Sequence, residues 1–220
     1  MKGCGVNTNY YRPLANGRKN GKRVFLFIGR LLYDKGIVEF VEAAKILKSK
    51  IKNTEFWVVG ELDSGNPSAI DKEQLVEWIN KKDIHYCGTT KDIRGYVKQT
   101  DVVVLPSYRE GLPKVILEGM AMGKPIITTD TAGCRETVEE DVNGYLVPVK
   151  DAKQLANAMM KMALQSGEDL ERMGNASREK TLEIFDDKII ANQFMEISDE
   201  ILETESSPVL SAIEEAIIFE

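Results

Sequence analysis

Two pairs of charged residues have types and spacings that suit the binding of a phosphorylated sugar. Glu110 and Glu118 stand eight residues apart in the stretch EGLPKVILE, around a Gly, a Pro and an apolar run. An ionised carboxylate only accepts hydrogen bonds, so one acid could hold hydroxyls of a sugar ring and the other the hydroxyl pair of a ribose. Arg30 and Lys35, in the stretch GRLLYDKG, could together hold a diphosphate.

Taken alone, neither pair is diagnostic. The chain has 35 acidic residues among 220, so two acids at this spacing also arise by chance. Both could be ordinary glutamates, one solvated on a helix and one favoured by the dipole at a helix start. The two cations could equally be surface charges, with Lys35 paired to Asp34 or Glu39. Residues 29–36 also lack the Gly-x-Gly-x-x-Gly pattern of ordinary dinucleotide-binding loops.

The elements that must position these residues can be read from the pattern of apolar residues. Short, nearly continuous apolar runs end at Gly, Pro or Asp, as buried parallel strands do. We expect strands at 24–29, 55–60, 84–88, 101–106, 125–130 and 144–148, and helices at 36–49, 71–81, 91–99, 113–122 and, as a short turn, 133–139. The alternation predicts an α/β fold, a doubly wound Rossmann-like parallel sheet of about six strands, with additional C-terminal helices at 151–165, 168–184 and 186–204.

This fold places both charged pairs at one edge of the sheet. In an open parallel sheet, ligands bind at the carboxyl ends of the strands, next to helix N-termini that favour anions. Residues 29–36 follow the first expected strand, and residues 106–113 follow the fourth. Gly111 would allow a ligand to approach closely, and Pro113 suits the first turn of the next helix. We therefore expect the cations and the acids to converge.

Three segments are expected along the chain. Residues 1–23, rich in Gly, Asn and basic residues, are interpreted as an interdomain linker remnant, and 24–204 as the Rossmann-like domain. Residues 205–220 form a tail of unknown role. Pro208 predicts a break in this tail, followed by an apolar helix-like pattern that could dock on the domain or on a partner.

The composition is ordinary for a globular protein and excludes several classes. It is 43% hydrophobic and 29% charged, and the net charge of −6 argues against nonspecific nucleic-acid binding. No apolar stretch approaches the roughly 18 residues that span a bilayer, and no signal peptide opens the chain. Cys4, Cys87 and Cys134 lack the spacing of a disulfide framework or a zinc site, which suits a reducing cytoplasm. We expect a cytoplasmic protein, and peripheral attachment to the inner face of the membrane stays open.

Three stretches together resemble a known family: GRLLYDKG, EGLPKVILEGMAMGKPII and the Gly-x-x-Glu segment GCRE at 133–136. They are similar to the carboxyl-terminal, donor-binding half of retaining GT-B glycosyltransferases of the group 1, or family 4, type. The bacterial members that build capsule, other polysaccharides or lipid-linked glycans are the most similar. Such enzymes have a Glu–seven–Glu motif, which Glu110 and Glu118 match. The resemblance covers about residues 5–200, and its motifs are specific only in combination.

The resemblance implies a role for each candidate residue. Arg30 and Lys35 would hold the donor's diphosphate and stabilise the charge on the departing nucleotide, which makes them catalytic together with Glu110 at the transferred sugar. Glu118 would hold the ribose. The other implied donor-binding residues are Gly29, Gly111, Leu112 and Pro113 near the sugar and phosphates, and Tyr86 and Cys87 near a uracil-type base. No metal or other cofactor is implied, and the chain has no Asp-x-Asp motif.

The resemblance also implies partners. In this family the acceptor site lies on an amino-terminal domain, and GVNTNYYRPL at 5–14 resembles the linker between the two domains. We therefore expect the donor half of a hexosyltransferase that uses a nucleotide sugar, UDP-linked, and a glycan or lipid-linked acceptor. It would need the missing acceptor domain or a partner subunit for turnover. Two alternatives stay open, a nucleotide-sugar epimerase of the same architecture and a noncatalytic nucleotide-sugar-binding subunit.

Overall fold

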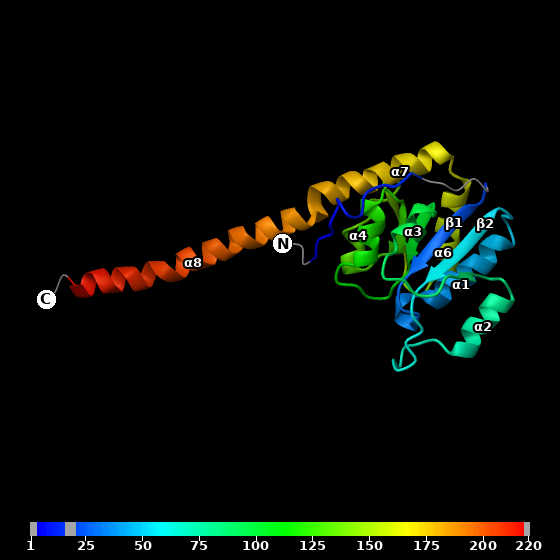
Figure 1. Ribbon diagram of the computed structural model, residues 1–220, viewed down its shortest axis with the longest axis horizontal. Coiled ribbons are helices and arrows are strands. Elements are labelled where there is room, and N and C mark those ends of the chain that lie inside the picture. Colours follow the sequence, from blue (N-terminus) through cyan, green and yellow to red (C-terminus); the bar gives the residue numbers. More distant parts are fainter. Residues whose placement is uncertain (1–3, 16–20, 218–220) are drawn as a thin grey trace.

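The centre of the protein is a parallel sheet of six strands in the order β3-β2-β1-β4-β5-β6 (Figure 1). The computed structural model describes residues 4–15 and 21–217, with side-chain surroundings up to residue 202. The strands are β1 Arg23–Ile28, β2 Thr54–Val59, β3 His85–Tyr86, β4 Val102–Leu105, β5 Ile126–Thr129 and β6 Gly144–Val147. The strand order reverses between β1 and β4, the position at which doubly wound sheets bind their ligands. The expected Rossmann-like fold is confirmed.

Helices connect the strands and follow the last of them. They are α1 Ile37–Lys48, α2 Lys72–Asn80, α3 Arg94–Lys98, α4 Lys114–Ala121, α5 Ala132–Arg135, α6 Ala152–Leu164, α7 Gly167–Lys180 and α8 Asp187–Ile217. A short 3-10 turn, η1 Tyr33–Lys35, precedes α1, and a π-helical turn, η2 Thr181–Phe185, precedes α8. Each helix expected from the sequence is present, with bounds that differ mainly at the ends.

Both faces of the sheet are buried, which explains the unbroken apolar run of β1. Phe25 and Phe27 point to the face covered by α1, where Phe27 lies 5.6 Å from the ring of Phe40. Leu26 and Ile28 point to the opposite face and belong to the apolar cluster around α3. A strand with only one buried face would alternate apolar and polar residues instead.

Arg178 is one of several residues that hold the amino-terminal segment 4–15 against the helices, beside the backbone hydrogen bonds of Val6 with Phe185 and Asp187. The guanidinium of Arg178, in α7, donates hydrogen bonds to the carbonyl oxygens of Thr8, Tyr11 and Ala121, at 2.9, 3.1 and 2.7 Å. Ala121 is the last residue of α4. Arg178 therefore ties the segment before the first strand to the helix that contains Glu118.

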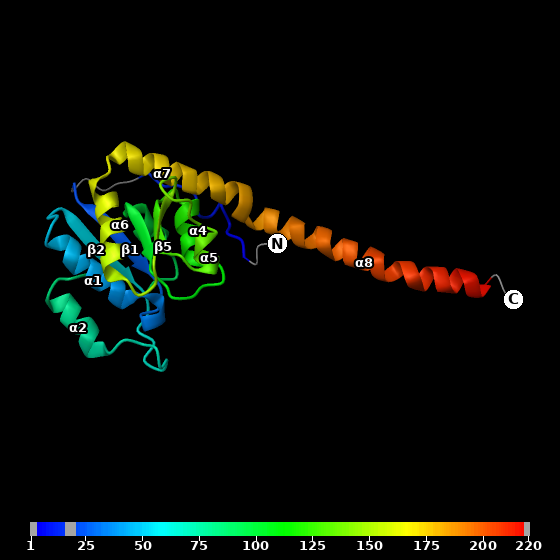
Figure 2. The same cartoon turned by 180° about the vertical axis from the view of Figure 1, so that it is seen from behind.

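Helix α8 extends far from the rest of the protein (Figures 1 and 2). The sequence predicted a helix end near residue 204 and a break at Pro208, but α8 runs through both positions to Ile217. A proline lacks one backbone N–H and so removes one intrahelical hydrogen bond, and here the helix continues across that loss. None of the helices within 4–15 and 21–217 has the length and apolar character needed to cross a membrane.

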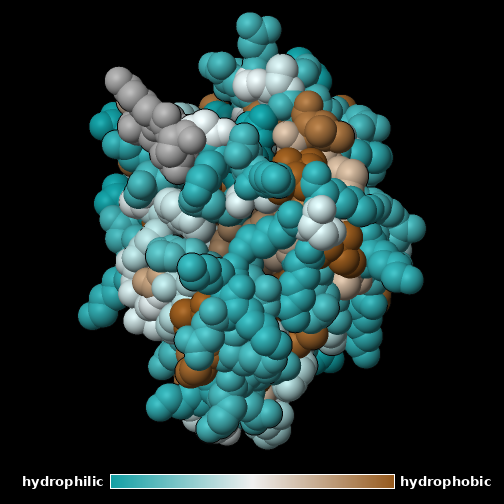
Figure 3. All heavy atoms as spheres, turned by 90° about the vertical axis from the view of Figure 1, so that its right-hand side faces the viewer, coloured by the Kyte–Doolittle hydropathy of each residue, from teal (hydrophilic) through white to brown (hydrophobic). Residues whose placement is uncertain are grey.

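Exposed hydrophobic side chains gather on α8. The face in Figure 3 is largely hydrophilic, with hydrophobic residues in small separate groups. On α8, by contrast, Phe194, Ile197 and Ile201 are 59%, 41% and 52% exposed. Their spacing of three and four residues places them on one side of the helix, and we call these three residues the α8 stripe.

Candidate functional site

The loops that follow β1, β4 and β5 meet at the carboxyl edge of the sheet. A Cβ atom added to Gly36 would lie 2.0 Å from the carbonyl oxygen of Pro106. A Cβ atom added to Gly133 would lie 1.5 Å from the carbonyl oxygen of Gly111. Only glycine permits such close approach of two backbones. The loop after β4 is therefore in direct contact with the segments that follow β1 and β5.

Lys35 and Glu110 form an ion pair at this edge. Nζ of Lys35 lies 2.6 Å from Oε1 of Glu110, and the two side chains are only 24% and 14% exposed. A charge-assisted bond between such poorly hydrated groups is stronger than an ordinary surface pair. The sequence left Asp34 or Glu39 open as partners of Lys35. The structure instead pairs it with an acid from the loop after β4, as the convergence of the two loops required.

Arg30 lies at the same edge but contacts a different acid. Its Nη1 is 3.3 Å from Oδ2 of Asp63, in the loop after β2. The Arg30 side chain is 54% exposed. Exposed ion pairs contribute little free energy, so this contact holds the guanidinium only weakly. The two cations thus flank the edge, one in the pair with Glu110 and the other near solvent.

Glu118 lies in α4 among neighbours of its own. It is only 9% exposed, which excludes the alternative of a solvated helix glutamate. The pKa of its carboxyl group is raised, mainly by burial and to a smaller extent by the charge of Asp92. A hydrogen bond with Tyr11 and the charge of Lys114 act in the opposite direction. Burial and Glu118 in turn raise the pKa of the Tyr11 phenol. The second carboxylate is therefore a buried acceptor in a mixed electrostatic environment.

The turn between the two acids leads into α4. Pro113 is the N-cap of α4, with φ −75° and ψ 109°, and Lys114 is the first helical residue. The sequence predicted Pro113 inside the first turn, but its extended ψ leaves it one residue before the helix. The side chain of the N-cap residue Pro113 makes no capping hydrogen bond, so N–H groups of the first turn can face an anion. A Cβ atom on Gly111 would meet no atom within 4 Å among the described residues, which leaves open space beside this turn.

Tyr86 and Cys87 are not brought next to the charged pair. They lie at the end of β3, and β2 and β1 separate this strand from β4. The Tyr86 phenol donates a hydrogen bond to the carbonyl oxygen of Gly60 at 2.9 Å, and burial raises its pKa. Burial also raises the pKa of the half-buried Cys87 thiol, which forms no disulfide with Cys4 or Cys134. Both residues border the loop after β2 rather than the ion pair.

Three residues around the site escaped the sequence analysis. Tyr11 lies in the segment interpreted as a linker, and Asp63 lies in a loop without a pattern. Tyr108 stands two residues before Glu110, and its phenol donates a hydrogen bond to Oε1 of Glu39 at 2.7 Å. The sequence offered one signal for these residues, the position of Tyr108 near the candidate acid Glu110. The contacts of all three join segments that are far apart in sequence, so local pattern could not predict them.

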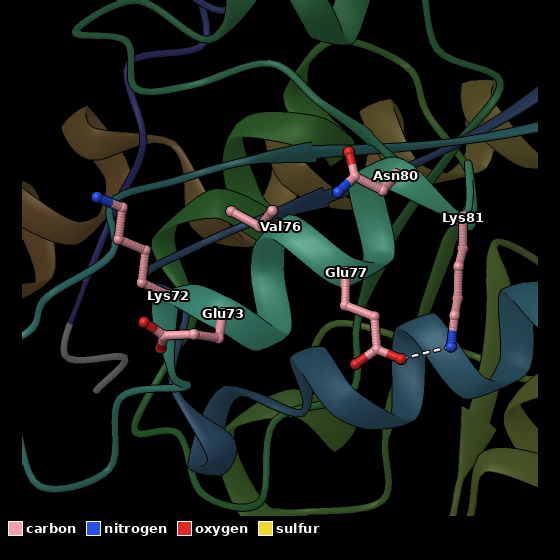
Figure 4. Close-up of a pocket in the computed structure, with 6 residues that line it drawn as sticks. All are labelled: Lys72, Glu73, Val76, Glu77, Asn80 and Lys81. Atoms are coloured by element: carbon pink, nitrogen blue, oxygen red, sulfur yellow. Dashed lines mark hydrogen bonds and ion pairs between the residues drawn. The ribbon is translucent and has the colours of Figure 1, made fainter.

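A separate depression lies on the outer side of α2 (Figure 4). It has a volume of about 470 Å³. Figure 4 shows an ion pair between Glu77 and Lys81 along one side of it. The lining residues are Lys72, Glu73, Val76, Glu77, Asn80 and Lys81. Four of the six lining side chains are charged, and the depression shares no residue with the loops at the carboxyl edge.

The sequence and the fold both match known proteins. The family profile described as "Glycosyl transferases group 1" matches residues 14–180. The chain is 30% identical over 213 residues to the N,N'-diacetylbacillosaminyl-diphospho-undecaprenol alpha-1,3-N-acetylgalactosaminyltransferase of Campylobacter jejuni, covering 92% of this chain and 54% of that protein. The chain thus spans about half the length of such relatives.

Two solved structures share the architecture. The C-terminal domain of the group 1 glycosyl transferase LpcC from Francisella tularensis matches with a TM-score of 0.72 and 26% identity, covering 83% of this chain and 100% of that chain. Anabaena HepE, in complex with UDP and glucose, matches in fold with a TM-score of 0.70 and 21% identity, covering 89% of this chain and 55% of that chain. With the profile matched over most of its length, the chain belongs to the glycosyl transferases group 1 family.

Proposed function

We propose that this chain binds the donor of a retaining glycosyl transfer, a UDP-linked sugar, at the carboxyl edge of its sheet. The observation that supports this most is the ion pair of Lys35 and Glu110, with 2.6 Å between its charged atoms. A diphosphate would compete with Glu110 for Lys35 and free the carboxylate to accept hydrogen bonds from the sugar hydroxyls. One contact thus joins the two groups that must hold adjacent parts of a nucleotide sugar.

The remaining roles follow from charge and position. Arg30, held weakly by Asp63, would turn to the diphosphate and, with Lys35, stabilise the negative charge of the departing UDP. The open start of α4 would provide backbone N–H groups for the same anion. Glu118, buried within α4, would accept hydrogen bonds from the ribose. The proposal includes no metal, because these cations supply the positive charge that the leaving group needs.

The choice of UDP and of the acceptor rests on relatives. Anabaena HepE has been crystallised with UDP and glucose. The Campylobacter jejuni relative is named for transfer to a diphospho-undecaprenol carrier. For this chain we propose a glycan or lipid-linked acceptor, held by an acceptor domain or partner subunit. The α8 stripe would pack against that acceptor half, because burying its exposed apolar side chains is favourable.

Calorimetric titration of the chain with nucleotide diphosphates tests the donor site. We expect UDP to bind, and UDP-sugars to bind at least as tightly, because the sugar adds contacts to Glu110. ADP and GDP should bind more weakly than UDP. If no nucleotide diphosphate binds at millimolar concentration, the proposed function is wrong. If ADP or GDP binds more tightly than UDP, the proposed donor site is supported and the choice of uracil as the base is wrong.

Glu118→Gln should weaken UDP binding about tenfold and weaken 2′-deoxy-UDP binding less, because that nucleotide keeps only the 3′-hydroxyl of the pair. The variant keeps the volume of the buried side chain but loses the charge that strengthens hydrogen bonds from the two ribose hydroxyls, a loss of about 1–1.5 kcal/mol. Calorimetry with both nucleotides measures the difference. Glu77→Gln, on the outer face of α2, is the matched control. Equal weakening of both nucleotides would contradict the ribose role.

The same carboxylate should make UDP binding depend on pH. Because the pKa of Glu118 is raised, protonation of the folded protein begins at a higher pH than for an ordinary glutamate. Only the ionised form accepts both hydroxyls, so affinity should fall as the pH is lowered through this raised pKa. Besides burial, the groups that shift the pKa of Glu118 are Tyr11, Lys114 and Asp92. In Glu118→Gln this part of the pH dependence should vanish.

A further inference from the structure

Tyr108 joins the loop of Glu110 to the segment that contains Lys35 at two points. Its backbone N–H donates a hydrogen bond to the carbonyl oxygen of Asp34 at 2.8 Å. Its phenol donates a second hydrogen bond to Oε1 of Glu39, in the first turn of α1, at 2.7 Å. Asp34 and Glu39 stand on either side of Lys35 in the chain. Tyr108 therefore spans the part of the backbone from which the Lys35 side chain extends.

The phenol contact lies in a poorly hydrated setting. Oε2 of Glu39 is buried and has no hydrogen-bond partner among the described residues, so the Tyr108 hydroxyl is the observed donor to this carboxylate. Above the ring, Nζ of Lys150, from the loop after β6, lies 5.0 Å from the ring centre. Three segments at the carboxyl edge thus meet at one tyrosine, and one of its neighbours is the half-buried carboxylate of Glu39, whose observed donor it is.

We propose that Tyr108, through Glu39, is a positioning residue that fixes Lys35 and Glu110 at the spacing required by a nucleotide diphosphate sugar. The inference rests on the proposed function, since it assigns Lys35 to the diphosphate. Tyr108 acts through the loops and does not itself touch the donor. The Ser107 hydroxyl adds a further link, because it donates a hydrogen bond to the carbonyl oxygen of Asp34 at 3.0 Å.

Removing a single oxygen isolates this role. In Tyr108→Phe the ring and the backbone hydrogen bond stay, and the Glu39 carboxylate loses its donor. A buried acceptor without a partner is unfavourable, so the first turn of α1 would shift until solvent reaches Glu39. That shift moves Lys35 relative to Glu110. The affinity for ligands that contain phosphate should therefore fall, whereas the affinity for a nucleoside without phosphate should not.

The test compares UDP with uridine by calorimetry on the whole chain. We expect Tyr108→Phe to weaken UDP binding roughly five- to tenfold and to leave uridine binding within about twofold, from the usual effect of losing one hydrogen bond to a charged group. Glu39→Ala should have the same effect. Glu39→Gln, which keeps an acceptor for the phenol, should restore most of the affinity for UDP. In the double variant Tyr108→Phe/Glu39→Ala the loss should be smaller than the product of the two single losses.

Tyr145→Phe is the matched control. Tyr145 lies in β6, its phenol hydrogen-bonds with Asp141, and the Lys161 ammonium lies 4.7 Å from its ring centre. This variant should lower thermal stability without changing the ratio of UDP to uridine affinity. An unchanged ratio in Tyr108→Phe would overturn the inference and leave the proposed function intact. Failure of the unaltered chain to bind UDP would overturn both.

Discussion

Lys35→Ala should weaken UDP binding about 10- to 150-fold, or roughly 1.5–3 kcal/mol, and should leave uridine binding nearly unchanged. The ammonium of Lys35 is only partly exposed, and among the described residues its ion-pair partner is Glu110, at 2.6 Å. A bound diphosphate would take over this cation. The alanine variant would present the diphosphate with an uncompensated Glu110 carboxylate instead, so repulsion adds to the lost attraction. Calorimetric titrations with UDP and with uridine measure the two affinities.

Lys22→Ala is the matched control for this experiment. Nζ of Lys22 lies 2.8 Å from Oε1 of Glu55, so the same substitution removes a lysine from a more exposed pair with a glutamate. Lys22 precedes the start of β1, at the opposite end of that strand from Lys35. This variant should bind UDP as the unaltered chain does. Equal losses of UDP and uridine in Lys35→Ala would mean that Lys35 supports the fold and does not contact the phosphates.

The fold could be predicted because its signals are local. The run VFLFI in β1 is apolar at every position, which only a strand buried on both faces requires, and Gly29 ends it. Stretches with the apolar periodicity of amphipathic helices separate such runs, so the helices could be predicted as well. The end of α8 could not be predicted in this way. Its continuation past Pro208 goes against the strongest local helix-breaking signal in that part of the chain.

The site could be predicted in part, for a different physical reason. The meeting of Lys35 and Glu110 follows from topology, since loops after neighbouring parallel strands share one edge. The partner of Arg30 did not follow, because Asp63 lies in a loop of irregular structure after β2. Tyr11 reaches Glu118 from the amino-terminal segment, which contacts such as those of Arg178 hold against α4. Such contacts depend on tertiary packing, so the local sequence pattern does not predict them.

Gly36→Ala should destabilise the folded protein by about 2–5 kcal/mol. Gly36 has φ 74°, a left-handed conformation that costs an alanine roughly 1–2 kcal/mol. The new Cβ atom would also lie 2.0 Å from the carbonyl oxygen and 2.7 Å from the carbonyl carbon of Pro106, so the backbone must move, at about 1–3 kcal/mol. Urea denaturation with a common slope measures the free energy of unfolding.

Gly88→Ala separates the two contributions, because Gly88 has φ 75° but a Cβ atom there would meet nothing within 4 Å in the described part of the chain. It should show only the conformational cost of about 1–2 kcal/mol. The excess in Gly36→Ala then measures how tightly the loops after β1 and β4 are pressed together. Relief of that clash requires Pro106 to move away from Gly36, and Glu110, four residues after Pro106, would move with it. Gly36→Ala should therefore also weaken UDP binding under conditions where the variant stays folded. Equal destabilisation by the two variants would mean that the loops yield freely, and the close approach at Gly36 would then do nothing to keep Lys35 beside Glu110.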